Sequence, residues 1–276
     1  MRAATWRRLP HLSLGATLVL SGACAISQQQ EVQVGNDYAA QLARELPVVR
    51  DASSERYLTT LGNALAQATD TRGLTWHFTI VNSREVNAFA VPGGWIYINR
   101  GLIERAENLS QLAGVLAHEI GHVTQRHSVQ QMQQAQGANA GVSLLCTLTK
   151  VCEGGAGQAA INVGGSALFA KFSRSDESEA DAEAVRTTIR AGYDPRGIPG
   201  MFRILLAEQQ RNPSVLEGFF LTHPLAADRV TATEGQIATV SATALRGLIT
   251  DTPAFQAFRR RLLALPPAPA AKAPSR

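Results

Sequence analysis

The sequence predicts a mainly helical α+β domain with one small β-sheet. Apolar residues recur at helical spacing along most of the chain, whereas only the segments 74–82 and 87–99 show the alternation that is typical of strands. The chain has 276 residues, of which 45% are hydrophobic and 17% are charged. This is an ordinary globular composition, and it supplies enough apolar side chains for one substantial core.

The first 25 residues have the layout of a secretory leader. Arginines precede an apolar run over 12–20 that is too short to span a bilayer, and small residues follow the run. The segment "LSGAC" resembles a bacterial lipobox that ends at Cys24, which favours lipidation of Cys24. Ordinary cleavage after Ala25 is the alternative. We therefore predict a leader over 1–25 and a periplasmic protein that a lipid anchors to the outer membrane.

Charge and cysteine content limit the classes of partner. Arg2, Arg7 and Arg8 belong to the leader, and removing them lowers the net charge from +4 to about +1, which gives no support to a nucleic-acid partner. In an oxidising compartment Cys146 and Cys152 are predicted to form a small disulfide loop, with two free, packed thiols as the alternative. Their spacing does not suit a metal site.

The first half of the chain is predicted from capping residues and periodicity. A polar linker over 27–33 comes before two packing helices, and a Pro-Gly-Gly turn joins two strands that lead into a helix. Asn108 or Ser110 can cap a long helix that continues to about Gln136. The predicted elements are helices at 37–46, 53–68 and 108–136, a strand at 74–82, and the strand-turn-strand unit at 87–103.

The second half is predicted to be helical after a loop. Residues 137–165 are rich in Gly and Ala and indicate a flap or loop. A helix begins at Ser175 or Asp176 and ends near Gly192, and the following helices are predicted at 197–210, 224–245 and 252–265. The Pro- and Ala-rich end, 266–276, is predicted to be disordered. One folded domain is therefore expected over 34–265.

The segment "GVLAHEIGHVTQRH", residues 114–127, places two histidines four residues apart on the long predicted helix. Positions i and i+4 lie one above the other, so His118 and His122 can bind one metal ion, while Glu119 flanks the ion without binding it. A carboxylate there suits a general base that takes a proton from water activated by zinc, and this predicts Glu119 as a catalytic residue in peptide hydrolysis. The alternative is three ordinary surface side chains.

A catalytic zinc site needs a third protein ligand. Glu177, in the segment "ESEAD", is favoured because small alanines on its helix allow close packing against the histidine helix. Asp181 shares the helical face of Glu177 and can accept a hydrogen bond from the outer nitrogen of a ligand imidazole. Glu153, in the Gly-rich loop, is the weaker alternative.

Four other titratable residues are given structural roles. Glu179 and Glu183 are predicted to be solvent-exposed charges that complement the dipole at a helix start. His127 is assigned to helix packing, and His77 is predicted to be a half-buried strand residue.

These segments together resemble peptidase family M48, the zinc metalloendopeptidases of the gluzincin class that include CAAX-prenyl endopeptidases and HtpX-like proteases. The resemblance covers 87–229 and rests on "NAFAVPGGWIYINRGLI", "HEIGHVTQRHS", "SRSDESEADAEAV" and "THPLAADRV". It implies a zincin-type metalloprotease domain that binds one Zn²⁺ per chain, with Glu177 as the third ligand and Asp181 beside it. It also implies that a strand at the cleft edge pairs with extended substrates. The strand residues concerned are Asn87, Ala88, Phe89 and Ala90.

His223, in "THPLAADRV", is open to two functional interpretations and one structural one. In soluble relatives the resemblance implies a histidine that either fills the open zinc position in a latent state or assists catalysis. A residue at a helix start is the structural alternative. Arg229 is predicted either to steady this loop or to form a surface ion pair.

The sequence therefore predicts a zinc-dependent endopeptidase of the bacterial envelope that acts on exposed or misfolded proteins. No segment after the leader is long and apolar enough to cross a membrane, so the resemblance is to the soluble periplasmic or lipid-anchored branch. No tetratricopeptide-like repeat follows the protease region, so the assembly-factor branch is not expected. The rival interpretation is a non-catalytic envelope lipoprotein or chaperone with a zinc-binding fold, but Glu119 favours the enzyme because a binding module needs no general base.

Overall fold

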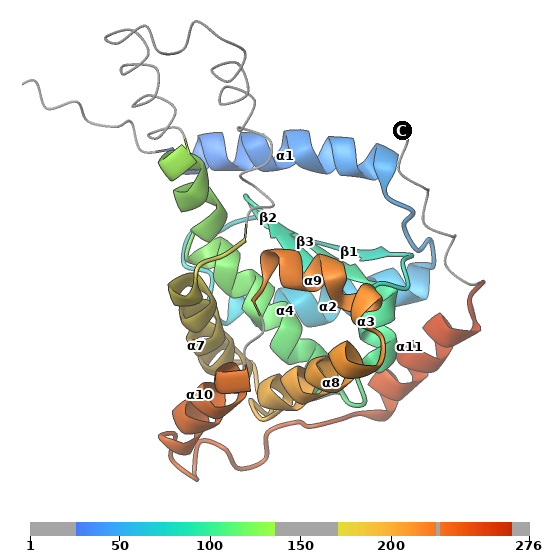
Figure 1. The fold of residues 1–276 in the computed structure, drawn as a ribbon, viewed down its shortest axis with the longest axis vertical. Helices are drawn as coiled ribbons and strands as arrows, with labels where there is room; N and C mark the ends of the chain where they lie inside the picture. The colour runs from blue at the N-terminus through green and yellow to red at the C-terminus, as the bar shows by residue number, and fades with distance from the viewer. Residues whose placement is uncertain (1–25, 136–170, 225–226, 267–276) are drawn as a thin grey trace, which may run out of the picture.

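The computed structural model describes residues 26–135, 171–224 and 227–266, and it has the predicted α+β fold with helices around a small sheet (Figure 1). In chain order the elements are α1 (Gln28–Glu45), α2 (Ala52–Gln67), β1 (His77–Val81), β2 (Ala88–Val91), β3 (Trp95–Asn99), α3 (Arg100–Arg105), α4 (Leu109–Thr124), α7 (Arg174–Arg190), α8 (Gly197–Arg211), the 3₁₀ helix η3 (Pro213–Leu216), α9 (Glu217–Thr222), α10 (Ala227–Ala238) and α11 (Pro253–Ala264).

The three strands form a mixed sheet in the order β1-β3-β2. β1 runs parallel to β3, and β2 pairs antiparallel with β3 through the turn that the Pro-Gly-Gly segment predicts. Gly93 and Gly94 have φ angles of 80° and 104°, which side chains with a Cβ rarely adopt. Because β3 lies in the middle, β2 is an edge strand of this sheet.

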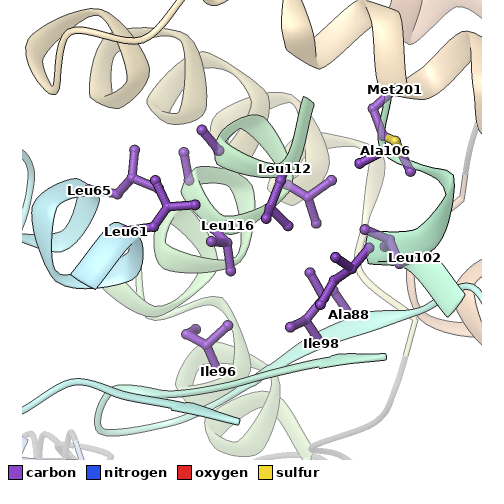
Figure 2. Packing of buried hydrophobic residues seen from close by; sticks show 14 of the residues in the cluster. Leu61, Leu65, Ala88, Ile96, Ile98, Leu102, Ala106, Leu112, Leu116 and Met201 are labelled. Atoms are coloured by element: carbon purple, nitrogen blue, oxygen red, sulfur yellow. The ribbon is translucent and has the colours of Figure 1, made fainter. Parts of the chain in front are cut away.

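The main core lies between α4 and one face of the sheet. α4 is buried along nearly its whole length and contacts α2, α7, α8 and the sheet, so it is the central helix of the fold. Leu112 and Leu116 of α4 point toward Ile96 and Ile98 of β3, while α2 covers the side of this layer (Figure 2). The apolar residues Leu112, Val115, Leu116 and Ile120 form a buried stripe on α4, and this stripe makes the histidine motif part of the core.

α1 covers the opposite face of the sheet, where Val81, Val91 and Tyr97 form a second, smaller cluster (Figure 1). The close approach needs a glycine, because a Cβ added to Gly35 would lie 1.9 Å from the carbonyl oxygen of Pro92. The prediction of a polar linker over 27–33 is wrong, since Ser27 caps α1 through a reciprocal hydrogen-bond pair with Gln30. Such a capping box stabilises a helix start in a polar segment.

The long helix predicted over 108–136 is interrupted. Asn108 caps α4 as expected, but α4 ends at Thr124, and Arg126 has a left-handed φ of 62° before residues 127–135 become helical again. No glycine or proline marks this break in the sequence. The conformation costs roughly 1–2 kcal/mol for a residue with a Cβ, and contacts of the Arg126 side chain with residues far away in sequence offset it.

Two differences occur near the C-terminal end. The helix predicted over 224–245 ends at Ala238, where Thr239 and Val240 begin a segment of lower helix propensity. The short helices η3 and α9 were not predicted, although they carry the chain into the site. The helices α7, α8 and α11 begin and end within two residues of the predicted bounds.

Several predictions fall outside the described residues. These are the predicted leader with Cys24, the predicted flap or loop over 137–165 with Cys146, Cys152 and Glu153, and most of the end, 266–276, for which disorder was predicted. Among the helices of the described ranges, none is both long and apolar enough to cross a membrane.

The central position of α4 predicts that truncating one of its buried apolar side chains destabilises the protein. Leu116 is fully buried, so Leu116→Ala leaves a cavity and is expected to lower the free energy of unfolding by about 2–5 kcal/mol. The matched control is Leu263→Ala on α11, where the side chain is 48% exposed and a change within about 0.5 kcal/mol is expected. Urea unfolding monitored by circular dichroism measures both variants. Equal losses would contradict the central place of α4.

Candidate metal centre

The centre is formed where α4 and α7 approach closely. A Cβ added to Gly121 on α4 would lie only 3.2 Å from the carbonyl oxygen of Ala180 on α7. Small residues at the contact therefore allow the two helix backbones to approach. Ser173 caps α7 with a capping box, and Glu177 in its first turn faces His118 and His122 across the interface.

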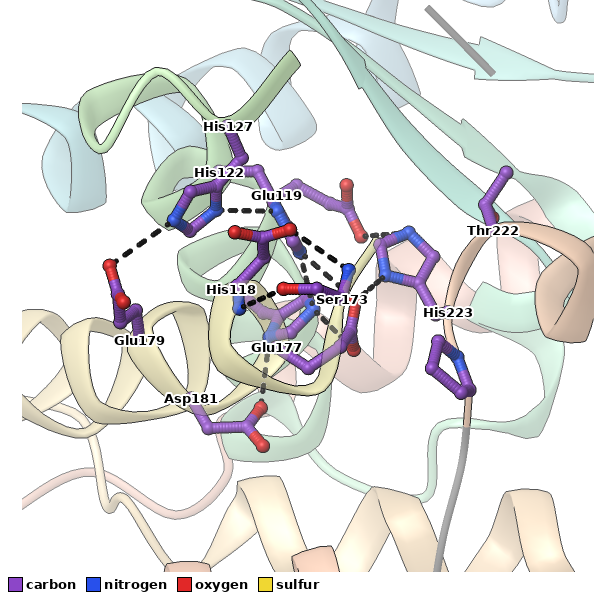
Figure 3. A network of polar contacts seen from close by, with 12 residues as sticks. His118, Glu119, His122, His127, Ser173, Glu177, Glu179, Asp181, Thr222 and His223 are labelled. Atoms are coloured by element: carbon purple, nitrogen blue, oxygen red, sulfur yellow. Dashed lines mark hydrogen bonds and ion pairs between the residues drawn. The ribbon is translucent and has the colours of Figure 1, made fainter. Parts of the chain in front are cut away.

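The predicted ligands converge on one point (Figure 3). The Nε2 atoms of His118 and His122 are 3.1 Å apart. Glu177 Oε2 lies 3.6 Å from His118 Nε2, and Glu177 Oε1 lies 3.5 Å from His122 Nε2. All three side chains are buried, and His223 joins them in a group whose possible ligand atoms lie within 4.8 Å of one another.

These distances fit a tetrahedral metal ion. Ligand atoms with bonds of about 2.0–2.1 Å to a tetrahedral ion lie about 3.3 Å from one another, close to the separations within this group. Both oxygens of Glu119 and the Nε2 atom of His223 are also buried without a hydrogen-bond partner. Buried polar atoms normally have partners, so the unsatisfied atoms around the histidines agree with a site for a cation.

Glu119 lies beside the ligands rather than among them. It follows His118 on α4 and is fully buried, and its Oε1 atom is 3.7 Å from His223 Nε2. Neither oxygen accepts a hydrogen bond within the described part of the chain. The carboxylate is therefore available to accept a proton at the edge of the centre, as the motif predicts.

Asp181 and Arg229 hold the outer side of His118. Asp181 Oδ1 is 3.0 Å from His118 Nδ1, and Arg229 donates to both oxygens of Asp181 at 2.8 and 2.7 Å. Arg229 also contacts Glu177 and the carbonyl oxygen of Pro224. Since the arginine is largely buried, the structure favours its predicted role in steadying the loop over the surface ion pair.

His122 is held by two residues whose roles sequence reasoning missed. His127 Nδ1 lies 2.9 Å from His122 Nδ1, and both rings are buried. The Phe172 ring stacks on His122 with centroids 3.9 Å apart. His127 therefore contacts a predicted ligand directly, in addition to packing as the sequence predicts. A third histidine five residues after the motif was the available signal, but only the break at Arg126 makes the contact possible.

α9 brings His223 into the centre. His223 follows the last residue of α9 and is fully buried, and its backbone N–H donates to Phe219 O. Its Nδ1 atom is 2.8 Å from Glu177 Oε1. This position is compatible with both functional interpretations of His223, and the choice between latency and catalysis stays a prediction.

The buried charges shift one another's proton equilibria. Burial raises the pKa of Glu119 and lowers the pKa of His122. Burial acts on Glu177 in the raising direction, but the nearby His223 and His122 outweigh it and hold the pKa of Glu177 well below its usual range. Burial opposes protonation of His223, yet the carboxylates of Glu119 and Glu177 raise the pKa of its imidazole. The cluster therefore favours an anionic Glu177 beside cationic groups.

The remaining site predictions concern the strand residues 87–90 and the two acids Glu179 and Glu183. Ala88 and Ala90 of β2 point into the core, and Asn87 and Phe89 are half-buried, so only the backbone edge of β2 is suited to pair with another strand. Glu179 is exposed as predicted, although its Oε2 atom lies 3.5 Å from His127 Nε2. The prediction for Glu183 is wrong, because this side chain is buried and accepts hydrogen bonds from Thr69 and Arg186.

Comparison with known proteins places this centre in a family. The profile of "Peptidase family M48" matches residues 52–237. The chain is 34% identical to a beta-barrel assembly-enhancing protease of Yersinia pestis over 83% of this chain and 48% of the relative. It is 33% identical to the protein of that name in Escherichia coli over 76% and 44%, and 29% identical to the metalloprotease LoiP of Escherichia coli over 72% and 77%. The chain thus spans about half the length of the assembly-enhancing proteases.

The buried arginine provides a test of the centre without metal. Arg229→Met leaves Asp181 and Glu177 without their guanidinium partner, and a loss of about 3–5 kcal/mol in the free energy of unfolding is expected for the metal-free protein. Arg203→Met is the matched control, because Arg203 pairs with Glu234 on the surface and a change of about 0–1 kcal/mol is expected. Urea titrations in the presence of chelator compare the two, and similar small losses would show that Arg229 does not balance the buried acids.

Proposed function

The chain belongs to peptidase family M48, and from this premise we propose that it is a zinc-dependent endopeptidase in which Glu119 is the general base. The observation that carries the proposal is the buried group of His118, His122 and Glu177 with an unpartnered carboxylate beside it. The names of the relatives, which are proteases and a metalloprotease, agree with this activity.

The residues divide into ligands and a proton acceptor. His118, His122 and Glu177 would hold the ion, which when bound lowers the pKa of a coordinated water and polarises the carbonyl of the peptide. Glu119 accepts the proton of the attacking water and then transfers it to the nitrogen of the leaving amine, so that the carboxylate is regenerated. Asp181 Oδ1 lies 3.0 Å from His118 Nδ1 and would orient this ring so that the lone pair of Nε2 is directed to the centre.

His223 has a regulatory part in the proposal. A fourth protein ligand leaves no position for water, so a protein with His223 at the ion would be latent. Its contact with Glu177 Oε1 and its place near Glu119 support this role. Opening the centre then requires movement of α9 and the residues that follow it.

The proposed substrates are exposed or unfolded protein segments in the bacterial envelope. An edge strand offers unpaired backbone groups, and β2 beside α4 provides such an edge for an extended peptide. The relatives named for β-barrel assembly and the leader-like residues 1–25 favour an envelope location, since barrels of this type belong to the bacterial outer membrane. Lipidation at Cys24 and anchoring to the outer membrane are part of the same proposal.

The general base is tested by separating metal binding from hydrolysis. Glu119→Gln is expected to retain one zinc ion per chain and to lower cleavage of unfolded casein by at least about 10²–10⁴-fold, because only the proton acceptor is removed. Glu177→Ala, in contrast, is expected to lose both zinc binding and casein cleavage. Metal analysis and casein cleavage are measured for both, with the exposed Glu234→Gln as the control. Normal cleavage by purified Glu119→Gln would exclude this mechanism.

Latency is tested at His223. His223→Ala is expected to raise basal casein cleavage severalfold while zinc remains bound, because the variant cannot fill the fourth position. A group that stabilises the transition state predicts the opposite sign in kcat. His77→Ala, at a histidine that stacks on Trp95 in the sheet, is the control for a lost imidazole. A lower or unchanged kcat with bound zinc would overturn latency.

A further inference from the structure

We propose that His127 is a positioning residue of the metal centre, which fixes the tautomer and ring orientation of His122. The inference rests on the proposed function only in assuming that His118, His122 and Glu177 bind a metal ion. His127 itself lies on the outer side of His122 and does not belong to the group of possible ligands.

The positions of the hydrogen atoms follow from the two contacts of each ring. His122 Nε2 faces His118 and Glu177, so it needs a free lone pair to bind an ion, and the proton of the neutral ring must be on Nδ1. That N–H lies 2.9 Å from His127 Nδ1, which must therefore accept. The proton of His127 is then on Nε2, which faces Glu179 Oε2 at 3.5 Å. The contact between the two rings therefore has one direction, with His122 as the donor and His127 as the acceptor.

The other histidine ligand has an equivalent partner of different chemistry. His118 Nδ1 lies 3.0 Å from Asp181 Oδ1, so each predicted ligand imidazole has an acceptor at its outer nitrogen. For His122 the acceptor is an imidazole, and Phe172 stacked on the ring leaves little freedom for rotation. Since His122 and His127 are both 1% exposed, solvent water does not replace this acceptor.

The break after α4 places His127 at this position. On a continuous helix, residue 127 would lie about 140° around the axis from residue 122, away from its outer nitrogen. The left-handed Arg126 changes the direction of the chain, and the Arg126 side chain donates to Glu31 Oε2 at 2.8 Å and to Ile26 O at 2.5 Å. Arg72 also donates to both Glu31 and Val123 O, so α1 is bound to the end of α4.

The experiment compares side chains with and without an acceptor at residue 127. His127→Phe and His127→Leu remove the acceptor, and His127→Gln retains one in its amide oxygen. We expect the first two to weaken zinc affinity by about 10–100-fold and His127→Gln to recover most of the loss, as for an outer partner of a metal-bound histidine. Zinc affinity is measured by chelator competition, and the thermal midpoint of each metal-free protein is recorded beside it. His77→Phe, which removes a histidine away from the centre, is expected to leave zinc affinity unchanged.

The outcomes separate this inference from the proposed function. A wild-type protein that binds no zinc would overturn the metal site itself. Bound zinc with equal affinity in wild type, His127→Phe and His127→Leu would overturn only the role of His127. A purely structural role is indicated when all three variants at residue 127 lose metal-free stability together and His127→Gln recovers no zinc affinity, and this result also overturns the proposal.

Discussion

The close contact between α4 and α7 is the constraint on which the centre depends. Gly121 and Ala180 let the two backbones approach, and one turn of α7 then places both Glu177 and Asp181 opposite the histidines of α4. A larger side chain at either position would separate the two helices. The distances near 3.5 Å between Glu177 and the two histidines would increase with that separation, although every predicted ligand would still be present.

Charge balance is the second requirement of so buried a site. Glu119, Glu177 and Asp181 are all nearly inaccessible to solvent, and Arg229 contacts two of these three acids. Burying an unpaired carboxylate costs folding free energy. One guanidinium carries a single positive charge and does not neutralise three carboxylates, so further positive charge would stabilise the site. A divalent cation and a protonated His223 are two sources of positive charge that the geometry allows. The buried acids therefore form a polar centre whose negative charge a bound cation would neutralise.

The sequence predicted those parts of the site that depend on local spacing. Residues at i and i+4 share one face of a helix. Helix periodicity was therefore sufficient to predict that the two histidines lie together on one helix and that Glu177 and Asp181 lie together on a second. Arg229 and His223 were left open because their positions depend on the unpredicted α9. His127 was only partly understood, because its contact follows from a left-handed residue without a local signal. That conformation depends on Glu31, which is 95 positions before Arg126 in the chain.

The attachment of α1 through Glu31 has a thermodynamic consequence. Glu31 accepts from Arg72 and Arg126, and these arginines contact the end of α4 and the residue before His127. Coupling between two equilibria is reciprocal. To the extent that docked α1 favours metal binding, a bound ion makes undocking of α1 less favourable by the same free energy. Such coupling would join the N-terminal helix and the metal centre in one cooperative unit, although they lie on different layers of the fold.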